Sequence, residues 1–242
     1  MIYFCIMQTV SFKDLGRMAY QEAWDYQEAL LARNVEVKSN RFGNSFYNGN
    51  DTTNYFLVVE HPDVYTLGKS GNIDNVLLTD KQRESLEIQF FKTNRGGDIT
   101  YHGPGQLVGY PILDLEKFRT DINWYMRSLE DVIILTLEEY GIKSSRSAGE
   151  TGVWIDPEIP GKERKICAMG VRCSRWITMH GFALNINTNL EFFNHIIPCG
   201  IPNKAVTSMQ KELGRTIDEN EVKKIVKKNF ELVFEVQLDL FQ

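Results

Sequence analysis

The chain has 242 residues and a formal net charge of −5 at pH 7, which excludes general electrostatic attraction to nucleic acid or to anionic membranes as its mode of binding. Hydrophobic residues make up 43% of the chain and aromatic residues 12%, an ordinary composition for a globular core. The length suits either one large domain or a domain with a small appendage.

The cysteines and the absence of export or membrane signals suggest the compartment. Residues 1–10 are apolar but have neither a positively charged start nor a small-residue cleavage site, so we expect a first strand there and no signal peptide. No apolar run approaches the length of a membrane span. The four cysteines form no CxxC pair, which favours reduced thiols and a cytoplasmic protein.

Strands and helices are predicted in an irregular order along the chain. After the first strand, Ala19, Ala23, Tyr26 and Leu30 recur at three- and four-residue steps and predict a helix over 14–33. The later predicted elements are a strand at 55–60, a short helix at 79–86, strands at 89–93 and 107–113, a helix at 120–141, strands at 153–155, 165–173 and 176–186, and a helix opened by a capping box at 216–219. Because neighbouring strands can pair antiparallel without regular βαβ units, the pattern favours an α+β fold.

The segment Arg95–Leu107 is the strongest candidate for a binding site. Its thirteen residues include four glycines, and it lies between two predicted strands, too long for a tight turn. Glycines let the backbone approach a ligand closely. Arg95, Tyr101 and His102 supply groups that can hold and polarise a carbonyl or carboxylate. We therefore expect this loop to bind a ligand.

Two cysteines compete for the role of nucleophile. Cys199 lies between Pro198 and Gly200, which predicts a sharp, exposed turn. Cys167 lies two positions from Lys165 on a predicted strand, so that both side chains should share a face. Lys165 itself is expected either to extend along an apolar edge or to be partly desolvated. Cys5 and Cys173 are assigned to inert core positions.

Other common chemistries lack their motifs. No histidine pair has metal-ligand spacing, so no metal site is expected. His180 on a strand is by itself more typical of a satisfied core group than of a catalyst. The chain also lacks a Walker loop, a GxGxxG motif and the GxSxG motif of serine hydrolases.

Several motifs together resemble those of the lipoyl(octanoyl) transferase family. The segment 95–106 (RGGDITYHGPGQ) closely resembles the family signature, and 165–170 (KICAMG), 180–185 (HGFALN) and 198–200 (PCG) followed by 206–208 (VTS) agree in order. The stretches 60–62 and 65–68 are also similar to the family. The match covers about 21–209.

The resemblance implies a biotin/lipoate protein ligase-like fold of the α+β class, with a mixed, largely antiparallel sheet, flanking helices and one catalytic domain over 1–242. It implies a cytoplasmic acyltransferase that moves an octanoyl group from octanoyl-[acyl-carrier-protein] to a lysine of lipoyl domains, in 2-oxoacid dehydrogenase complexes and in the glycine cleavage H protein. Catalysis would use a thioester on Cys199 with Lys165 as acid/base partner, and neither ATP nor another cofactor. The implied substrate-binding residues are Arg95, Gly96, Gly97, Asp98, Ile99, Thr100, Tyr101, His102, Ala168, Met169, Gly170, His180, Gly181, Phe182 and Ala183.

Two alternatives of other classes remain open at this point. An ATP-dependent lipoate or biotin ligase would share the fold, but would need ATP with free acid and would not need Cys199. A non-catalytic lipoyl-domain binding protein would form no acyl-enzyme. Both expected protein partners are acidic, so docking would need local positive charge; Lys204 is the better candidate, and the lysines of the last predicted helix are better explained as a solvated face.

Overall fold

A mixed sheet forms the centre of the molecule, whose computed structural model describes residues 7–43, 51–197 and 205–240. Its eight strands run in the order β10-β8-β9-β6-β2-β1-β11, with β7 paired to β8. These strands are β1 (Gln8–Arg17), β2 (Asn54–Glu60), β6 (Gln106–Ile112), β7 (Val153–Ile155), β8 (Arg164–Ser174), β9 (Ile177–Asn185), β10 (Ala205–Val206) and β11 (Val236–Leu240).

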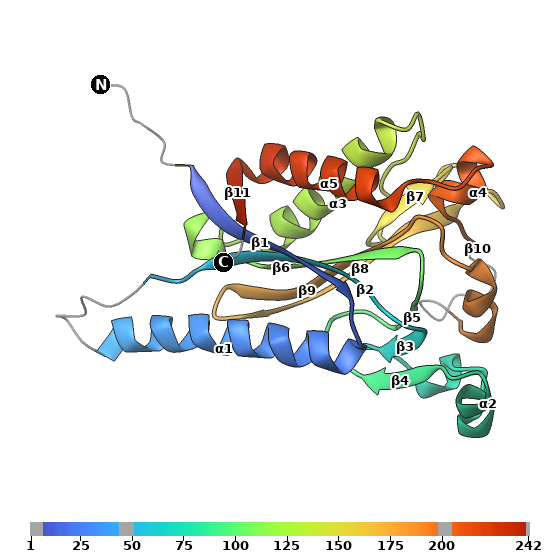
Figure 1. Ribbon diagram of the computed structural model, residues 1–242, viewed down its shortest axis with the longest axis horizontal. Helices are drawn as coiled ribbons and strands as arrows, with labels where there is room; N and C mark the ends of the chain where they lie inside the picture. The colour runs from blue at the N-terminus through green and yellow to red at the C-terminus, as the bar shows by residue number, and fades with distance from the viewer. Residues whose placement is uncertain (1–6, 44–50, 198–204, 241–242) are drawn as a thin grey trace.

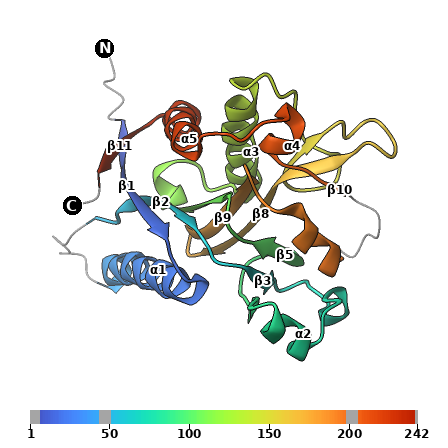
Figure 2. The same ribbon diagram turned by 45° about the vertical axis from the view of Figure 1, so that its right-hand side comes forward.

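A second, three-stranded sheet in the order β4-β3-β5 lies on the same side of the main sheet as the first helix (Figures 1 and 2). It consists of β3 (Val64–Leu67), β4 (Gln89–Lys92) and β5 (Ile99–His102). Across the described residues, five strand pairs are antiparallel and four are parallel. The main sheet alone has four antiparallel and three parallel pairs, so it is mixed, as expected, with antiparallel pairs only narrowly in the majority.

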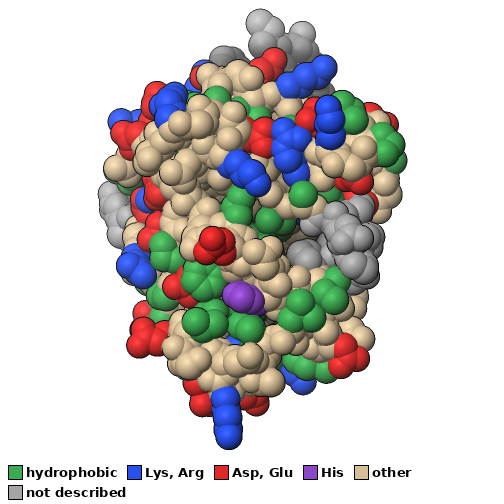
Figure 3. All heavy atoms as spheres, turned by 90° about the vertical axis from the view of Figure 1, so that its right-hand side faces the viewer, with side chains coloured by type: hydrophobic (Ala, Val, Ile, Leu, Met, Phe, Trp, Pro, Cys, Tyr) green, Lys and Arg blue, Asp and Glu red, His purple; other side chains and the backbone are tan. Residues whose placement is uncertain are grey.

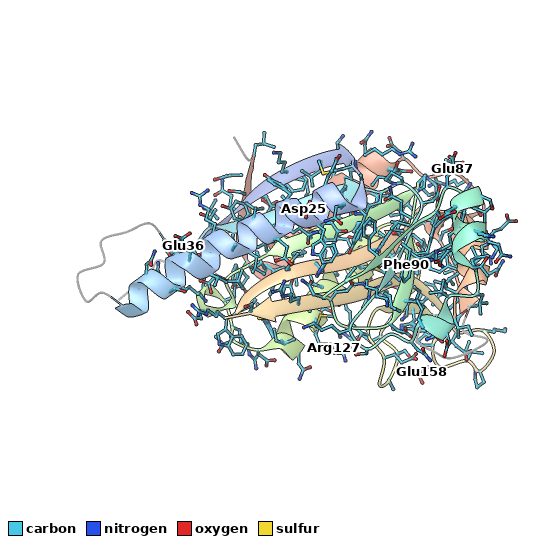
Figure 4. All side chains as sticks on the ribbon, turned by 90° about the horizontal axis from the view of Figure 1, so that it is seen from below. Asp25, Glu36, Glu87, Phe90, Arg127 and Glu158 are labelled. Carbon is cyan, nitrogen blue, oxygen red and sulfur yellow. The ribbon has the colours of Figure 1, made fainter. Side chains whose placement is uncertain are left out.

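Helices cover both faces of the main sheet (Figure 1). The helix α1 (Tyr20–Gly43) crosses one face, and Asp25 and Glu36 lie on its exposed side (Figure 4). The helices α3 (Ile122–Glu138) and α5 (Glu219–Phe234) pack on the opposite face. The shorter helices are α2 (Asp80–Ser85), α4 (Met209–Leu213) and the 3-10 turns η1 (Ile73–Asn75), η2 (Leu115–Lys117) and η3 (Leu190–His195). None of the helices in the described residues has both the length and the apolar character that a membrane crossing requires.

The start of the first helix was predicted wrongly. Residues 14–17 continue β1, which pairs with β2 and β11, and α1 begins only at Tyr20. The buried face of α1 consists of Tyr20, Ala23, Gln27, Leu30, Leu31, Asn34 and Lys38. At its start this face contains Tyr20, whereas the predicted apolar stripe began with Ala19. Pairing with β2, which includes Asp14 and Arg17, therefore overrides the local helical periodicity there.

Two helix caps also differ from the prediction. Asp121, not Thr120, caps α3 by accepting the backbone N–H of Trp124. Asp218 caps α5 through the backbone N–H groups of Asn220 and Glu221, so Thr216 does not open a capping box. Thr79 and Gln82 do form a capping box at the start of α2. Of the first strand expected in residues 1–10, residues 1–6 lie outside the described residues, and β1 begins at Gln8 and continues to Arg17. The other predicted strands and helices are confirmed to within a few residues.

Candidate functional site

A cavity of about 440 Å³ lies where the Arg95–Leu107 segment meets β8 and β9. The volume falls within the range of about 300–1,000 Å³ typical of small-molecule sites. The residues that line it come from both sides of the main sheet, since Val108 and Ala183 belong to the core under α1 while Phe182 belongs to the core under α3 and α5. The cavity is thus lined by residues from the cores on both faces of the sheet.

Most of the expected binding residues share this cavity. It is lined by Arg95, Gly96, Gly97, Asp98, Ile99, Thr100, His102, Lys165, Ala168, Met169, Gly170, His180, Gly181, Phe182 and Ala183. Segments that are far apart in the sequence therefore converge on one site.

Tyr101 is a member of the expected set that does not line the cavity. Its side chain is fully buried, donates a hydrogen bond to Asp63 Oδ1 at 2.5 Å and stacks on Phe192 at 5.0 Å. Because neighbouring residues of a strand point to opposite faces, Tyr101 supports β5 from behind while His102 faces the cavity.

Cys167 does not share a face with Lys165. The register of β7 and β8 shifts between Trp154 and Val153, so β7 advances by one residue while β8 advances from Lys165 to Cys167. This bulge breaks the two-residue alternation. Cys167 is fully buried in the core, where burial raises the pKa of its thiol, whereas Lys165 lines the cavity. A buried thiol of this kind is a poor nucleophile.

The other cysteines complete the comparison. Cys173 is exposed near the end of β8, so its assignment to the core is wrong. Cys5 and Cys199 lie outside the described residues, as does Lys204.

The Arg95–Leu107 segment is attached to the edge of β8. The backbone N–H of Gly96 donates to the carbonyl of Val171 at 2.9 Å. The approach requires glycine on β8, because a Cβ at Gly170 would lie 2.8 Å from the Gly96 carbonyl oxygen. Gly97 has φ +87°, a conformation that side chains disfavour. Two glycines therefore let the loop lie directly against the strand that carries Lys165.

The Arg95 guanidinium binds carbonyl oxygens of the small sheet and of its own loop. Its Nη2 donates to the Thr66 carbonyl at 2.5 Å and to Thr66 Oγ1 at 2.9 Å, and its Nη1 donates to the Gly96 carbonyl at 3.0 Å. The residue is 8% exposed. Arg95 therefore joins β3 to the loop and lends a buried positive charge to the cavity wall.

His102, Gln106 and Asn185 form a hydrogen-bonded row along one wall of the cavity. Gln106 Oε1 lies 2.8 Å from His102 Nδ1, and its Nε2 donates to Asn185 Oδ1 at 2.9 Å. Asn185 Nδ2 donates in turn to the carbonyl of Thr207 at 3.0 Å. Burial, with His61 and Arg95 nearby, holds the pKa of His102 well below its usual range, so the ring is neutral at pH 7.

The residues that follow the 198–204 segment lie beside Lys165. The short strand β10 pairs Val206 with Lys165, and the backbone N–H of Thr207 donates to the Lys165 carbonyl at 2.9 Å. Before that segment, the N–H of Ile197 donates to the Asn75 carbonyl at 2.9 Å. Val206 lines the cavity, so the described chain resumes after residue 204 at the cavity wall next to Lys165.

His180 occupies an unusual backbone position with φ +60°. Its Nε2 lies 2.8 Å from Asn94 Oδ1, and its backbone N–H donates to Gln27 Oε1 at 3.0 Å. Burial lowers the pKa of the ring to about 3, with smaller contributions from Arg95 and Arg172. His180 therefore presents a neutral ring to the cavity.

Several lining residues were missed by sequence reasoning. They are Tyr20, Gln106, Val108, Tyr110, Met126, Gly149, Glu150, Thr151, Val171, Asn185, Phe193 and Val206. Gln106, Asn185 and Val206 stand inside or beside the quoted motifs, which was a usable signal. Met126 and Gly149–Thr151 carry no motif and reach the cavity only through the packing of α3 and of the loop before β7.

No group of three or more metal-ligating side chains occurs among the described residues.

Figure 3 shows the face on the right of Figure 1, where Lys and Arg side chains gather in the upper half. Three of the four lysines of α5 have partners within the chain: Lys223 pairs with Asp14, Lys228 pairs with Glu139, and Lys227 lies over the Phe12 ring.

The sequence model of the lipoyl protein ligase A/B catalytic domain matches residues 19–231. The chain is 55% identical over 232 residues to an octanoyltransferase of Christiangramia forsetii, covering 95% of this chain and 97% of that protein. It is 56% identical over 230 residues to an octanoyltransferase of Flavobacterium psychrophilum, covering 94% and 97%.

Solved structures give the same fold at low identity. A lipoate-protein ligase A bound with ATP superposes with a TM-score of 0.69 at 12% identity, covering 97% of this chain and 89% of that one. A bi-partite lipoate protein ligase from Thermoplasma acidophilum gives 0.67 at 14% identity, covering 97% and 87%. The chain belongs to the lipoyl protein ligase A/B catalytic domain family and has the lipoate protein ligase fold.

Proposed function

We propose that this protein transfers an octanoyl group from octanoyl-[acyl-carrier-protein] to a lysine of lipoyl domains through a thioester on Cys199. The protein is an acyltransferase of protein lipoylation, because relatives named octanoyltransferase are 55–56% identical to it over 94–95% of its length. The observation that carries the proposed mechanism is the convergence of Lys165 and Val206 on one cavity, since Val206 lies seven positions after Cys199.

The proposed reaction has two balanced steps. The Cys199 sulfur attacks the thioester carbonyl of the donor, forming a new C–S bond while the carrier thiol leaves with a proton. The lysine amine of the acceptor then attacks this thioester, forming the amide, and the Cys199 thiol is released. No ATP is needed, because the incoming thioester is already activated.

Lys165 is the proposed proton carrier in both steps. A drop in thiol pKa from about 8.5 to about 7 would raise the thiolate fraction roughly fifteen-fold at pH 7, but would lower its nucleophilicity about five-fold. Because the net gain would be only about threefold, activation of the thiol alone would contribute little. Lys165 would therefore act mainly by accepting the Cys199 proton, passing it to the carrier thiol, and later accepting one from the attacking amine.

The cavity suits an uncharged hydrocarbon chain. Val108, Phe182 and Ala183 offer apolar surface, and the rings of His102 and His180 are neutral at pH 7. Burial of the octanoyl hydrocarbon would contribute roughly 5 kcal/mol at about 0.8 kcal/mol per carbon. This term would favour binding of an acyl chain over that of a short thioester.

The solved lipoate protein ligases share only the fold with this chain, at 12–14% identity, so similarity favours the transferase over the ligase. The acceptors would be lipoyl domains of 2-oxoacid dehydrogenase complexes and the glycine cleavage H protein; one ligase of the same fold is described together with its E2 lipoyl domain. The proposed setting is the cytoplasm, where thiols stay reduced.

The test is mass spectrometry of the protein after incubation with octanoyl-[acyl-carrier-protein]. The proposal requires one octanoyl adduct that peptide digestion maps to Cys199. Cys199→Ala should abolish both the adduct and the transfer to a lipoyl domain, whereas the matched control Cys167→Ala should retain both.

Three results would contradict the proposal. An adduct on Cys167 would reverse the assignment of the nucleophile. The absence of any adduct would favour a non-catalytic binding protein, and activity that depends on ATP and free octanoate would favour a ligase.

A further inference from the structure

A carboxylate with no exposed surface lies on α3 behind the cavity. The side chain of Glu130 is 0% exposed. Its Oε2 pairs with Arg127 Nη1 at 2.6 Å and with Arg146 Nε at 2.9 Å. Its Oε1 accepts the backbone N–H of Gly152 at 3.0 Å. Glu130 therefore binds both Arg146 and Gly152, the two residues that flank the loop before β7.

That loop forms part of the cavity wall. Gly149, Glu150 and Thr151 line the cavity, and Arg146 and Gly152 stand on either side of them. Arg146 is also attached to α3 through Asp131, at 2.6 Å, and through the carbonyl of Arg127, at 3.0 Å. The wall segment is thus held to α3 at both ends, and Glu130 takes part in both attachments.

Gly152 lies directly against Lys165. Its φ is +109°, and a Cβ built on it would lie 3.5 Å from Lys165 Cε and 2.5 Å from the carbonyl oxygen of Cys167. The Lys165 side chain therefore lies against the backbone of Gly152, whose N–H donates a hydrogen bond to Glu130. A shift of Gly152 would move the surface on which the Lys165 side chain rests.

Stability alone is a poor explanation for this arrangement. Removing a carboxylate from water is costly, and a buried ion pair recovers that cost only when its remaining hydrogen bonds are made. The two arginines are still 48% and 38% exposed in their side chains, so water weakens their attraction to the buried carboxylate. The bond from Oε1 goes to backbone beside Lys165, a place where geometry matters for chemistry.

We infer that Glu130 is a positioning residue: it fixes the 149–152 wall through Arg146 and the Gly152 N–H, and thereby holds Lys165 in place for proton transfer. This inference rests on the proposed function, because it assigns a role relative to Lys165. It adds a residue from α3 that touches neither substrate nor the reacting sulfur.

The test compares Glu130→Ala, Glu130→Gln and the matched control Asp131→Asn. Glutamine keeps an oxygen that can accept the Gly152 N–H, whereas alanine does not. Asp131 is the next residue on the same helix, pairs with the same Arg146 and is 46% exposed in its side chain, but it does not contact Gly152. If Glu130→Ala fails to fold, Arg146→Gln replaces it, since Arg146 is partly exposed and holds the other end of the wall.

The readout is the single-turnover rate of octanoyl adduct formation per active site, with active sites counted from the final adduct. A merely structural role would lower the melting temperature and the number of active sites but leave this rate unchanged. We expect the rate to fall about tenfold or more in Glu130→Ala, because small misplacements of catalytic groups carry costs of this order. Glu130→Gln should retain more of the rate than alanine. Asp131→Asn should lose far less of it than Glu130→Ala, because Arg146 keeps its contacts with Glu130 and with the Arg127 carbonyl. The KM for a small octanoyl thioester should stay unchanged.

Two outcomes would overturn the inference: a wild-type rate per active site in Glu130→Ala, or an equal loss in Asp131→Asn. Both differ from failure of the proposed function, in which the wild-type protein itself would form no adduct on Cys199.

Discussion

The Lys165 ammonium lies over the indole ring of Trp154, 4.6 Å from the ring centroid. The two residues are opposite each other in the antiparallel pairing of β7 and β8. Trp154 is 2% exposed, so the ring is a fixed surface beside the cavity. The proposed proton carrier is thus held by an aromatic face on one strand and by the Gly152 backbone just before it.

Replacement of Trp154 by leucine should slow transfer more than replacement by phenylalanine. An ammonium over an aromatic face gains about 0.5–2 kcal/mol, and phenylalanine keeps such a face while leucine does not. The measurement is the single-turnover rate for both variants at a temperature well below their melting points. Equal rates at equal stability would show that the ring only fills space.

Lys165→Arg should lose most of the activity. Arginine keeps the positive charge but cannot release a proton at physiological pH. The measurement is the rate of transfer to a lipoyl domain, with circular dichroism as the folding control. Rates near that of the wild type would show that positive charge alone suffices and would remove the proton-transfer role.

Gly181→Ala should destabilise the protein far more than Gly96→Ala, although both glycines line the cavity. A Cβ at Gly181 would overlap the backbone carbonyl of Gly109 on the neighbouring strand, which cannot move aside. A Cβ at Gly96 would approach only the Val171 carbonyl, at 3.4 Å. Overpacking typically costs about 1–3 kcal/mol, so urea unfolding should separate the two variants. Similar midpoints would contradict the packing argument.

The free energy of unfolding should fall as the pH is lowered from about 6.5 to 5. Burial lowers the pKa of His61 to about 4 and that of His180 to about 3, while the unfolded value is about 6.5. Between these values the unfolded state binds more protons, so stability rises with pH, by at most about 1.4 kcal/mol per pH unit for each histidine.

Urea unfolding at several pH values measures this slope. His61→Gln should flatten it, because one of the neutral rings is removed; His195→Gln, a half-buried position, is the matched control. A slope that both variants leave unchanged would assign the pH dependence to other groups.

The sequence predicted the elements whose signals are local. The apolar run of β2 and the stripe of α3 fixed those elements, and the glycine-rich segment marked the cavity. The two-residue strand β10 has no sequence signal of its own, because its pairing with Lys165 depends on tertiary contacts. The strand β11 was missed although Val236–Leu240 alternates apolar and polar residues, which is a usable strand signal.

The errors at the site have a common physical cause. Strict alternation placed Cys167 beside Lys165, but the bulge in β8 turned it into the core. The Gly149–Thr151 wall could not be predicted, because the residues that flank it, Arg146 and Gly152, are bound by Glu130 of the distant helix α3. The periodicity of apolar residues locates strands well, but the position of a β-bulge within a strand depends on the strands that pair with it.

The pairing of Val206 with Lys165 and of Gly96 with Val171 also bears on when the protein becomes reactive. Both contacts join residues that are far apart in the sequence. Such contacts form late in folding, because the chain between them must lose conformational entropy before the contact can stabilise the fold. Residues around Val206 must also have left the ribosome before the first contact can form. A chain caught partway through synthesis or folding would therefore lack the cavity wall beside Lys165, and acyl transfer would begin only once the sheet is complete.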